Sequence, residues 1–207
     1  ENLRTLGIEE NVVMIPHGIY PPPSDSAESL PMEGRVMGTF GFLLPHKGQL
    51  ELIEAFDRLP GWDELLLLCA TREGSGNMEK KVNSLIQNKG LTGRVRLVTD
   101  FLDDDVAIST LSKCELLVFP YQNTKESASG AVRMGVAAGV PLAVTPISIF
   151  DDIAGAIKMR GRSVDDIVAS ISAIGQKNLD SSRESMIKLR DALQWDEVAK
   201  RIQERLK

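Results

Sequence analysis

Apolar runs alternate with stretches of helical spacing along most of this chain. Six runs rich in apolar and β-branched residues predict strands, and the stretches between them place apolar residues three or four positions apart, as on one face of a helix. Residues 65–68 are all leucine, which is typical of a parallel strand covered by helices on both faces. We therefore expect an α/β fold with a doubly wound, mostly parallel open sheet and a ligand site beyond the carboxyl ends of its strands. The predicted strands are residues 12–15, 36–40, 65–70, 95–98, 116–119 and 142–145.

Two regions interrupt this alternation. Residues 20–31 hold three consecutive prolines followed by small polar residues, so a mobile loop is expected there, between the first two strands. After residue 145 the strand signal weakens and helical spacing takes over. The predicted C-terminal helices are residues 165–174, 183–193 and 196–206.

Composition narrows the class of protein. The 207 residues are 43% hydrophobic and 26% charged, which is ordinary for a globular domain. A net charge of −5 without clustered lysines and arginines argues against a nucleic-acid partner. No apolar run reaches the roughly 18 to 20 residues that span a bilayer, so no membrane span is expected. Cys69 and Cys114 lie in separate apolar runs with no third thiol, which favours buried, reduced cysteines of a cytoplasmic protein over a disulfide or zinc site.

The expected organisation is a single Rossmann-like domain over residues 1–207. Residues 1–10 are interpreted as a linker or helix from a preceding domain, and residues 195–207 as a C-terminal helix. Because the chain begins with Glu1 rather than methionine, we expect an upstream part that this sequence lacks.

The most informative segment is residues 125–141, which follow a predicted buried strand. Ser127, Ser129 and Gly130 place small residues and free backbone N–H groups at the start of a predicted helix, and Gly139 ends that helix. The N-terminal end of a helix carries a partial positive charge that favours a phosphate. This segment therefore predicts an anion-binding site.

A second loop, residues 38–48, again joins a strand to a helix through a glycine-containing turn. In a parallel sheet this turn lies at the same edge as the segment around Glu126, so Lys47 could place its ammonium group beside a bound phosphate. A solvated lysine at a helix start remains the alternative. The motif G-x-x-x-x-G-K-[ST] is absent, which excludes a phosphate-loop nucleotidase.

Other candidates carry weaker signals. Gly74 and Gly76 match part of the dinucleotide motif G-x-G-x-x-G, so residues 71–77 form either a plain turn or a ligand contact. His17 and His46, the only histidines, stand either at the edge of the expected cleft or simply on the surface.

No catalytic metal site is expected. The acidic run Asp103–Asp105 is interpreted as the first turn of a helix rather than as a cation site. H-E-x-x-H, G-x-S-x-G and clusters of ligands at metal-binding spacing are all absent from the sequence.

Four groups of residues follow one another in an order that resembles the C-terminal donor-binding domain of a GT-B glycosyltransferase. The resemblance is closest to the retaining family four (glycosyl transferases group 1). The resemblance covers about residues 10–205. Residues 12–19 are similar to V-x-x-I-P-N-G-V, residues 41–48 to G-R-L-x-x-x-K-G, residues 95–101 and 114–120 to the strand pair before the signature loop, and residues 126–141 to E-x7-E followed by A-M-A-x-G-x-P-V.

The resemblance implies a retaining, metal-independent transfer of a hexose from a UDP-sugar or GDP-sugar to a glycan or lipid-linked acceptor. The acceptor site would lie in a missing N-terminal domain, so this domain alone should be inactive. Lys47 matches the lysine that binds the donor diphosphate and Glu126 the glutamate that faces the donor sugar, which makes them the expected catalytic residues. A cation and a helix N-terminus suit the charge that builds on the departing nucleoside diphosphate. The expected donor-binding residues are Gly41, Lys47, Ser127, Ala128, Ser129, Gly130 and Arg133.

Two positions depart from the family pattern. Phe42 stands where the arginine that pairs with Lys47 is usual, and Met134 stands where a second glutamate would bind the ribose hydroxyls. Each lost charged hydrogen bond is typically worth about 1.5–3 kcal/mol. Arg133 is the candidate for a substitute charge, although its helical neighbours are apolar. The alternatives are therefore a divergent enzyme, a degenerate glycosyltransferase-like domain with a binding or structural role, and another α/β enzyme with a phosphate cradle, such as a sugar-nucleotide epimerase.

Overall fold

A computed structural model describes residues 7–205 of the chain, except residues 9, 11, 14, 125 and 127. Its centre is a six-stranded parallel sheet with the strand order β3-β2-β1-β4-β5-β6. The predicted α/β class and open parallel sheet are confirmed. The strands are β1 (Val36–Phe42), β2 (Glu64–Ala70), β3 (Val95–Val98), β4 (Leu116–Phe119), β5 (Leu142–Val144) and β6 (Ile157–Lys158).

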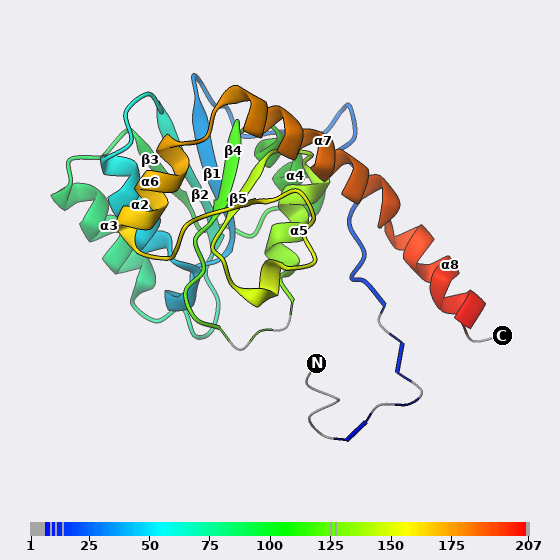
Figure 1. Cartoon of the computed structure of the whole chain (residues 1–207). Helices are drawn as coiled ribbons and strands as arrows, with labels where there is room; N and C mark the ends of the chain where they lie inside the picture. The colour runs from blue at the N-terminus through cyan, green and yellow to red at the C-terminus, as the bar shows by residue number, and fades with distance from the viewer. Residues whose placement is uncertain are drawn as a thin grey trace.

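Helices cover both faces of this sheet (Figure 1). One face carries α2 (Gln49–Asp57), α3 (Met78–Asn88) and α6 (Val164–Ser172), and the other carries α4 (Asp104–Ser112) and α5 (Gly130–Ala137). The long helix α7 (Gln176–Ala192) contributes Leu179 to the core of the first face and Met186 to the core of the second. The last helix, α8 (Trp195–Arg205), follows α7, and two short 3-10 helices are η1 (Pro45–Lys47) and η2 (Ser148–Phe150). None of the described helices is long and apolar enough to cross a membrane.

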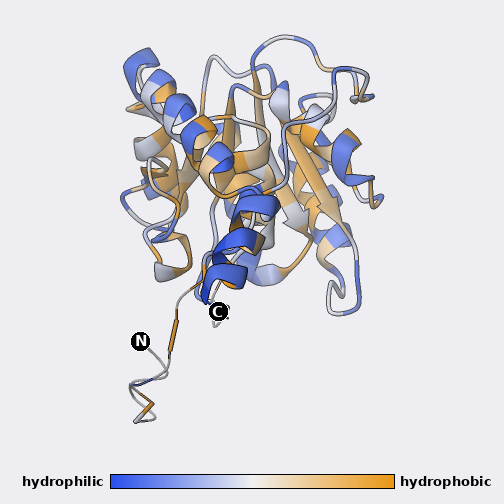
Figure 2. Ribbon diagram, turned by 90° about the vertical axis from the view of Figure 1, so that its right-hand side faces the viewer, coloured by the Kyte–Doolittle hydropathy of each residue, from blue (hydrophilic) through white to orange (hydrophobic). Residues whose placement is uncertain are grey.

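The pleat of β2 explains why its leucine run is apolar at every position. Leu65, Leu67 and Cys69 pack into the core beneath α2, α3 and α6, whereas Leu66 and Leu68 pack into the core beneath α4, α5 and α7. Successive side chains of a strand point to opposite faces, so a strand with a helical layer on each side buries all of them. Figure 2 shows the result as apolar strands inside a shell whose outer helix sides are polar.

The chain changes direction across the sheet between β1 and β4. From β1 the chain continues to β2 on one side, and from β4 it continues to β5 on the other, although β1 and β4 are hydrogen-bonded neighbours. The loops that follow these two strands therefore separate at the carboxyl edge and leave a crevice, which is where ligands bind in open α/β sheets.

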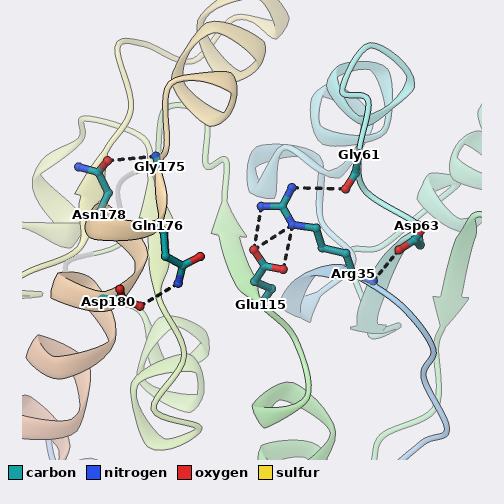
Figure 3. Close-up of polar contacts among 8 residues, drawn as sticks. All are labelled: Arg35, Gly61, Asp63, Glu115, Gly175, Gln176, Asn178 and Asp180. Atoms are coloured by element: carbon teal, nitrogen blue, oxygen red, sulfur yellow. Dashed lines mark hydrogen bonds and ion pairs between the residues drawn. The ribbon is translucent and has the colours of Figure 1, made fainter.

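An ion pair joins the same two strands at their opposite, amino-terminal ends (Figure 3). Arg35 precedes β1 and donates from Nε (2.8 Å) and Nη2 (2.7 Å) to the carboxylate of Glu115, which precedes β4. Arg35 also donates from Nη1 to the carbonyl of Gly61 (3.3 Å), and its backbone N–H donates to Asp63 Oδ2 (2.7 Å). This bidentate contact fixes the central strands at the end away from the crevice.

The first predicted strand, residues 12–15, is wrong. Its described residues Val12, Val13 and Ile15 lie in no strand and are exposed. An apolar run becomes a strand only when a neighbour pairs with its backbone, and none of the described strands does so here. Only Ile19, further along, enters the core, where it is 1% exposed.

The proline-rich segment, residues 20–31, contains neither helix nor strand, as predicted, but it precedes β1 rather than lying between two strands. It is bound to α4: Ser24 donates from its backbone N–H and its hydroxyl to the carboxylate of Asp105 (3.1 and 2.9 Å), and the Leu30 N–H donates to Thr110 Oγ1 (3.1 Å).

The C-terminal half follows the prediction with two differences. The helices α6, α7 and α8 lie where helical spacing predicts them, but α7 begins at Gln176 rather than at residue 183, because its first turns are mostly polar and lack an apolar period. Strand β6 was not predicted, since two residues are too few to show a strand pattern.

Candidate functional site

A cavity of about 440 Å³ opens at the carboxyl edge of the sheet. Its walls come from the loops that follow β1, β2, β3 and β4 and from the start of α5. Both segments that the sequence analysis singled out reach it: Lys47 lies at the end of η1, after β1, and Glu126 lies in the loop between β4 and α5. The topology thus brings residues 79 positions apart into one site.

Lys47 and Glu126 form an ion pair inside this cavity. Lys47 Nζ donates to Glu126 Oε2 at 2.6 Å. The lysine side chain is only 9% exposed, whereas the glutamate side chain is 36% exposed. The solvated-lysine alternative is therefore wrong, because the ammonium group lies buried in the wall of the cavity.

Gly48 explains how the turn after β1 reaches this position. It has φ of 75°, and a Cβ added to it would lie 2.0 Å from the carbonyl oxygen of Pro120. Only glycine allows both the left-handed backbone and this close approach. Since Pro120 directly follows β4, Gly48 holds the Lys47 turn against the beginning of the loop that carries Glu126.

Tyr121 supports both halves of the site from below. Lys47 Nζ lies 4.0 Å from the centre of its ring, a cation–π contact, and the tyrosine hydroxyl lies 2.9 Å from Ser129 Oγ. Tyr121 is 1% exposed. One buried side chain therefore links the lysine on the β1 loop to the first turn of α5.

The two charged groups shift each other's titration. Burial lowers the pKa of Lys47, a hydrogen bond and charge from Glu126 oppose that change, and the nearby charge of Arg72 adds to it. Burial alone would raise the pKa of Glu126, but the hydrogen bond and charge of Lys47, together with His46, outweigh it, so this pKa is lowered. His46 Nε2 lies 3.3 Å from Glu126 Oε1 without hydrogen-bond geometry.

The first turn of α5 has the geometry expected of an anion site. Ser129 is its N-cap, with Oγ accepting from the Val132 N–H at 3.3 Å, and the helix begins at Gly130. Ala128, Ser129 and Gly130 all line the cavity, while predicted Ser127 lies outside the described residues. The first N–H groups of a helix have no partner inside it, so they are available to a ligand.

Gly41, another predicted donor-binding residue, also lines the cavity. Its φ is 132°, a region that favours glycine, and an added Cβ would lie 3.0 Å from Ala131 Cβ. The end of β1 therefore passes very close to the first turn of α5.

Arg133 and Met134 form another part of the wall. Arg133 is 4% exposed; its Nη1 donates to the Ser129 carbonyl at 3.0 Å and its Nη2 pairs with Asp152. Its Nε has no partner among the described residues. Met134, 5% exposed, presents an apolar surface where the resemblance places a carboxylate.

The structure adds site residues that the motifs did not indicate. Tyr121 and Arg72 each stand two positions beyond a predicted strand, after β4 and β2, and Phe101 stands three beyond β3. The sequence held one signal for these residues: each follows shortly after a predicted strand. Because the carboxyl ends of parallel strands share one edge of the sheet, residues in these positions are candidates for the site. In the loop 71–77, Arg72 lines the cavity but neither Gly74 nor Gly76 does.

The remaining candidates lie at the edge of the site or outside it. His17 lines the cavity. Its Nδ1 donates to the Gly18 carbonyl at 2.7 Å, and its ring packs against Trp195 with ring centres 5.2 Å apart. The acidic run Asp103–Asp105 forms the N-cap and first turn of α4, as predicted. Within the described part of the chain, no three His, Cys, Asp or Glu side chains gather as a metal site requires.

Comparisons with known proteins place this arrangement in a family. Residues 24–188 match the family described as glycosyl transferases group 1. No curated protein matches the chain in sequence. Solved structures also share the fold, and three of them show the extent of the match. Sucrose-phosphate synthase from Thermosynechococcus elongatus has a TM-score of 0.73 at 17% identity, covering 92% of this chain and 50% of that one.

The second is HepE from Anabaena in complex with UDP and glucose, with a TM-score of 0.70 at 16% identity, covering 84% of this chain and 48% of that one. The third is the C-terminal domain of LpcC, a glycosyl transferase group 1 family protein from Francisella tularensis. Its TM-score is 0.65 at 15% identity, and the match covers 83% of this chain and 93% of that one. This chain spans about half the length of the first two and corresponds to the single C-terminal domain of the third. The family match over most of the residues and the shared GT-B architecture lead to one assignment: the chain belongs to the glycosyl transferases group 1 family.

Proposed function

We propose that this chain is the donor-binding half of a retaining, metal-independent glycosyltransferase of the cytoplasm, which transfers a hexose from a UDP-sugar or GDP-sugar to a glycan or lipid-linked acceptor. The observation that carries the proposal is the ion pair between buried Lys47 and partly exposed Glu126, which lies beside the first turn of α5 at the switch point of the sheet. Family membership supports the reaction class, and the UDP and glucose in the HepE structure support the donor class. The acceptor would bind to a further domain outside this chain.

The chemistry of the site fits the demands of this transfer. When the anomeric C–O bond breaks, its electron pair goes to the diphosphate oxygen, and the negative charge of the leaving group grows. The Lys47 ammonium group and the N-terminal turn of α5 both stabilise negative charge. Burial strengthens these interactions, because less water screens them. Glu126, on the same wall, would face the donor sugar.

The size of the cavity also suits a nucleotide sugar. At about 440 Å³ it falls within the range of roughly 300–1,000 Å³ that small-molecule sites occupy. Apolar groups such as Phe40, Leu68 and Met134 line it together with the few charged ones. A pocket of this kind offers apolar surface to a base and ribose and charge to a diphosphate.

Isothermal titration calorimetry with UDP, GDP and their glucose and mannose conjugates tests donor binding directly. We expect binding to at least one of these ligands, weakened at least tenfold in Lys47→Ala, since a charged hydrogen bond contributes about 1.5–3 kcal/mol. Lys188→Ala is the matched control: this lysine on α7 is 73% exposed and pairs only with Glu184. If the wild-type protein binds none of these ligands, the proposed function is wrong.

A second candidate function rests on Met134 and Phe42, two uncharged side chains in the cavity wall. Their presence favours a domain that keeps the fold and binds a partner without catalysing transfer. The complete protein would then bind an acceptor or a protein partner but release no nucleoside diphosphate from any sugar donor. Epimerisation or hydrolysis of the donor without an acceptor would instead indicate a different reaction.

A further inference from the structure

A diphosphate in this cavity needs more positive charge than Lys47 supplies. The Lys47 ammonium group is already hydrogen-bonded to the Glu126 carboxylate at 2.6 Å, so the pair carries little net charge. A nucleoside diphosphate brings more than one negative charge, and burying it without matching cations is costly. A second cation in the wall, beside Lys47 and the first turn of α5, would lower that cost.

Two arginines line the cavity, and only one of them has a guanidinium group free for a ligand. Arg133 uses Nη1 on the Ser129 carbonyl and Nη2 on Asp152, which ties its charge to the first turn of α5 and to a carboxylate. Arg72 makes no ion pair with any carboxylate that the structure describes. Its charge remains available.

The register of the sheet places Arg72 beside position 42. Phe42, the last residue of β1, pairs with Ala70, the last residue of β2, and Arg72 follows two positions later. The Arg72 guanidinium carbon lies 4.5 Å from the centre of the Phe42 ring. A guanidinium over an aromatic face gains a cation–π contact and keeps its N–H edge free for other partners.

The loop that carries Arg72 is held in place. The Arg72 N–H donates to Ser75 Oγ at 3.0 Å, and the Ser75 N–H donates back to the Arg72 carbonyl at 2.9 Å. Ser75 is 6% exposed, so this small turn is anchored in the protein. Arg72 is also close enough to Lys47 for its charge to contribute to the lowered pKa of that lysine. Two cations thus face a shared space, where an anion relieves their repulsion.

We propose that Arg72 is the second cation of the diphosphate subsite. The β2–α3 loop brings its guanidinium group beside Phe42, the uncharged last residue of β1. This inference rests on the proposed function, because it assumes that the cavity binds a nucleoside diphosphate. The phenyl ring of Phe42 supports the guanidinium, whose planar N–H groups match two phosphate oxygens at once. Arg133 holds the first turn of α5 instead.

Titration of UDP and GDP into wild type, Arg72→Ala and a control variant tests this inference. Arg58→Ala is the control, since it removes a guanidinium that pairs with Asp165 and does not line the cavity. We expect Arg72→Ala to weaken the preferred nucleoside diphosphate about tenfold, as loss of a charged hydrogen bond does. The unphosphorylated nucleoside, measured by competition, should bind equally to both variants. Phe42→Arg, added to Arg72→Ala, should restore most of the lost affinity by supplying a guanidinium from β1.

The outcomes separate this inference from the function on which it rests. If wild type binds a nucleoside diphosphate and Arg72→Ala binds it as tightly as Arg58→Ala does, the inference is wrong and the proposed function stands. If Arg72→Ala weakens the nucleoside as much as the diphosphate, Arg72 shapes the loop rather than binding phosphate, and the inference is also wrong. If wild type binds no nucleoside diphosphate, both proposals fall. Unfolding midpoints that agree between the variants show that each one folds.

Discussion

Gly48 sets the distance between the two loops that hold the charged pair, so replacing it should affect stability and binding together. In Gly48→Ala the new Cβ would meet the Pro120 carbonyl oxygen at 2.0 Å, a distance that forces the backbone of one loop to move. The φ of 75° adds the strain of a left-handed conformation, which costs an L-residue about 1–2 kcal/mol. Forcing extra atoms into a packed site typically costs a further 1–3 kcal/mol, roughly. We therefore expect a total loss of about 2–5 kcal/mol.

Gly90→Ala separates these two contributions. Gly90 has φ of 67° and nothing within 4 Å of an added Cβ, so alanine there meets only the backbone strain. It should cost about 1–2 kcal/mol. The difference between the two variants then measures the close approach of Gly48 to Pro120, because the left-handed strain is common to both.

Urea unfolding followed by circular dichroism measures both variants under one set of conditions. For a domain of this size, about 2–5 kcal/mol corresponds to a fall in melting temperature of roughly 4–20 °C. Nucleotide titration into the folded variants supplies the second readout: Gly48→Ala should bind the nucleoside diphosphate more weakly than Gly90→Ala, since its Lys47 turn has moved. Equal unfolding free energies for Gly48→Ala and Gly90→Ala would refute the reasoning, because the contact with Pro120 would then impose no constraint.

Three further residues, Glu126, Ser129 and Cys69, carry testable predictions. Glu126→Gln should bind UDP about 1.4- to fivefold more tightly, because UDP no longer displaces a partly exposed ion pair worth about 0.2–1 kcal/mol. Weaker binding by calorimetry would contradict this. The pKa of Glu126 is lowered, so its ionised carboxylate stabilises the fold above its ordinary pKa, and this contribution is lost as the pH falls through the lowered pKa. Glu126→Gln lacks that contribution at every pH and should therefore lose less stability than wild type between pH 5 and pH 3. Ser129→Ala removes the N-cap of α5 and a hydrogen-bond partner of the Tyr121 hydroxyl, which should cost about 1–3 kcal/mol of stability. The control is Ser163→Ala, which removes the N-cap of α6. It should cost about 1 kcal/mol and leave nucleotide binding unchanged, because Ser163 does not line the cavity. Burial raises the pKa of Cys69 to about 12, so its reaction with a disulfide reagent at pH 8 should proceed only as fast as the protein unfolds, and a rapid reaction of the native protein would show that the thiol is accessible.

Local patterns in the sequence were enough to predict the layers of the fold. The strands at residues 95–98 and 116–119 are confirmed at both ends, because each is a short apolar-rich run that begins after a charged residue and ends before Thr99 or Pro120. The run at residues 12–15 looks similar, yet its described residues form no strand. Whether an apolar run becomes a strand depends on a partner for its backbone, and a single sequence does not show the partner.

The candidate site was predictable wherever a motif combined with the geometry of a parallel sheet. Lys47 and Glu126 meet because each follows a strand of the same edge, which is the logic that placed them in one cleft. Tyr121 was missed, and Arg72 was covered only by the ligand-contact alternative for residues 71–77, because the placement of both side chains depends on packing across neighbouring loops. Arg133 shows the converse: its sequence position suggested a charge for the ligand, but the fold pairs it with Asp152.

Unequal burial of the Lys47–Glu126 pair indicates which partner would move when a donor binds in the proposed function. Lys47 is 9% exposed and is held from below by the Tyr121 ring, whereas Glu126 is 36% exposed on an irregular loop. Rotating the glutamate therefore breaks fewer contacts and needs less desolvation than withdrawing the lysine. A diphosphate arriving at the first turn of α5 would replace the carboxylate as the counter-ion of Lys47, and the freed Glu126 would turn toward the space that the sugar enters. In the proposed function, the ion pair with Glu126 would thus hold the Lys47 ammonium group in place until the diphosphate replaces the carboxylate.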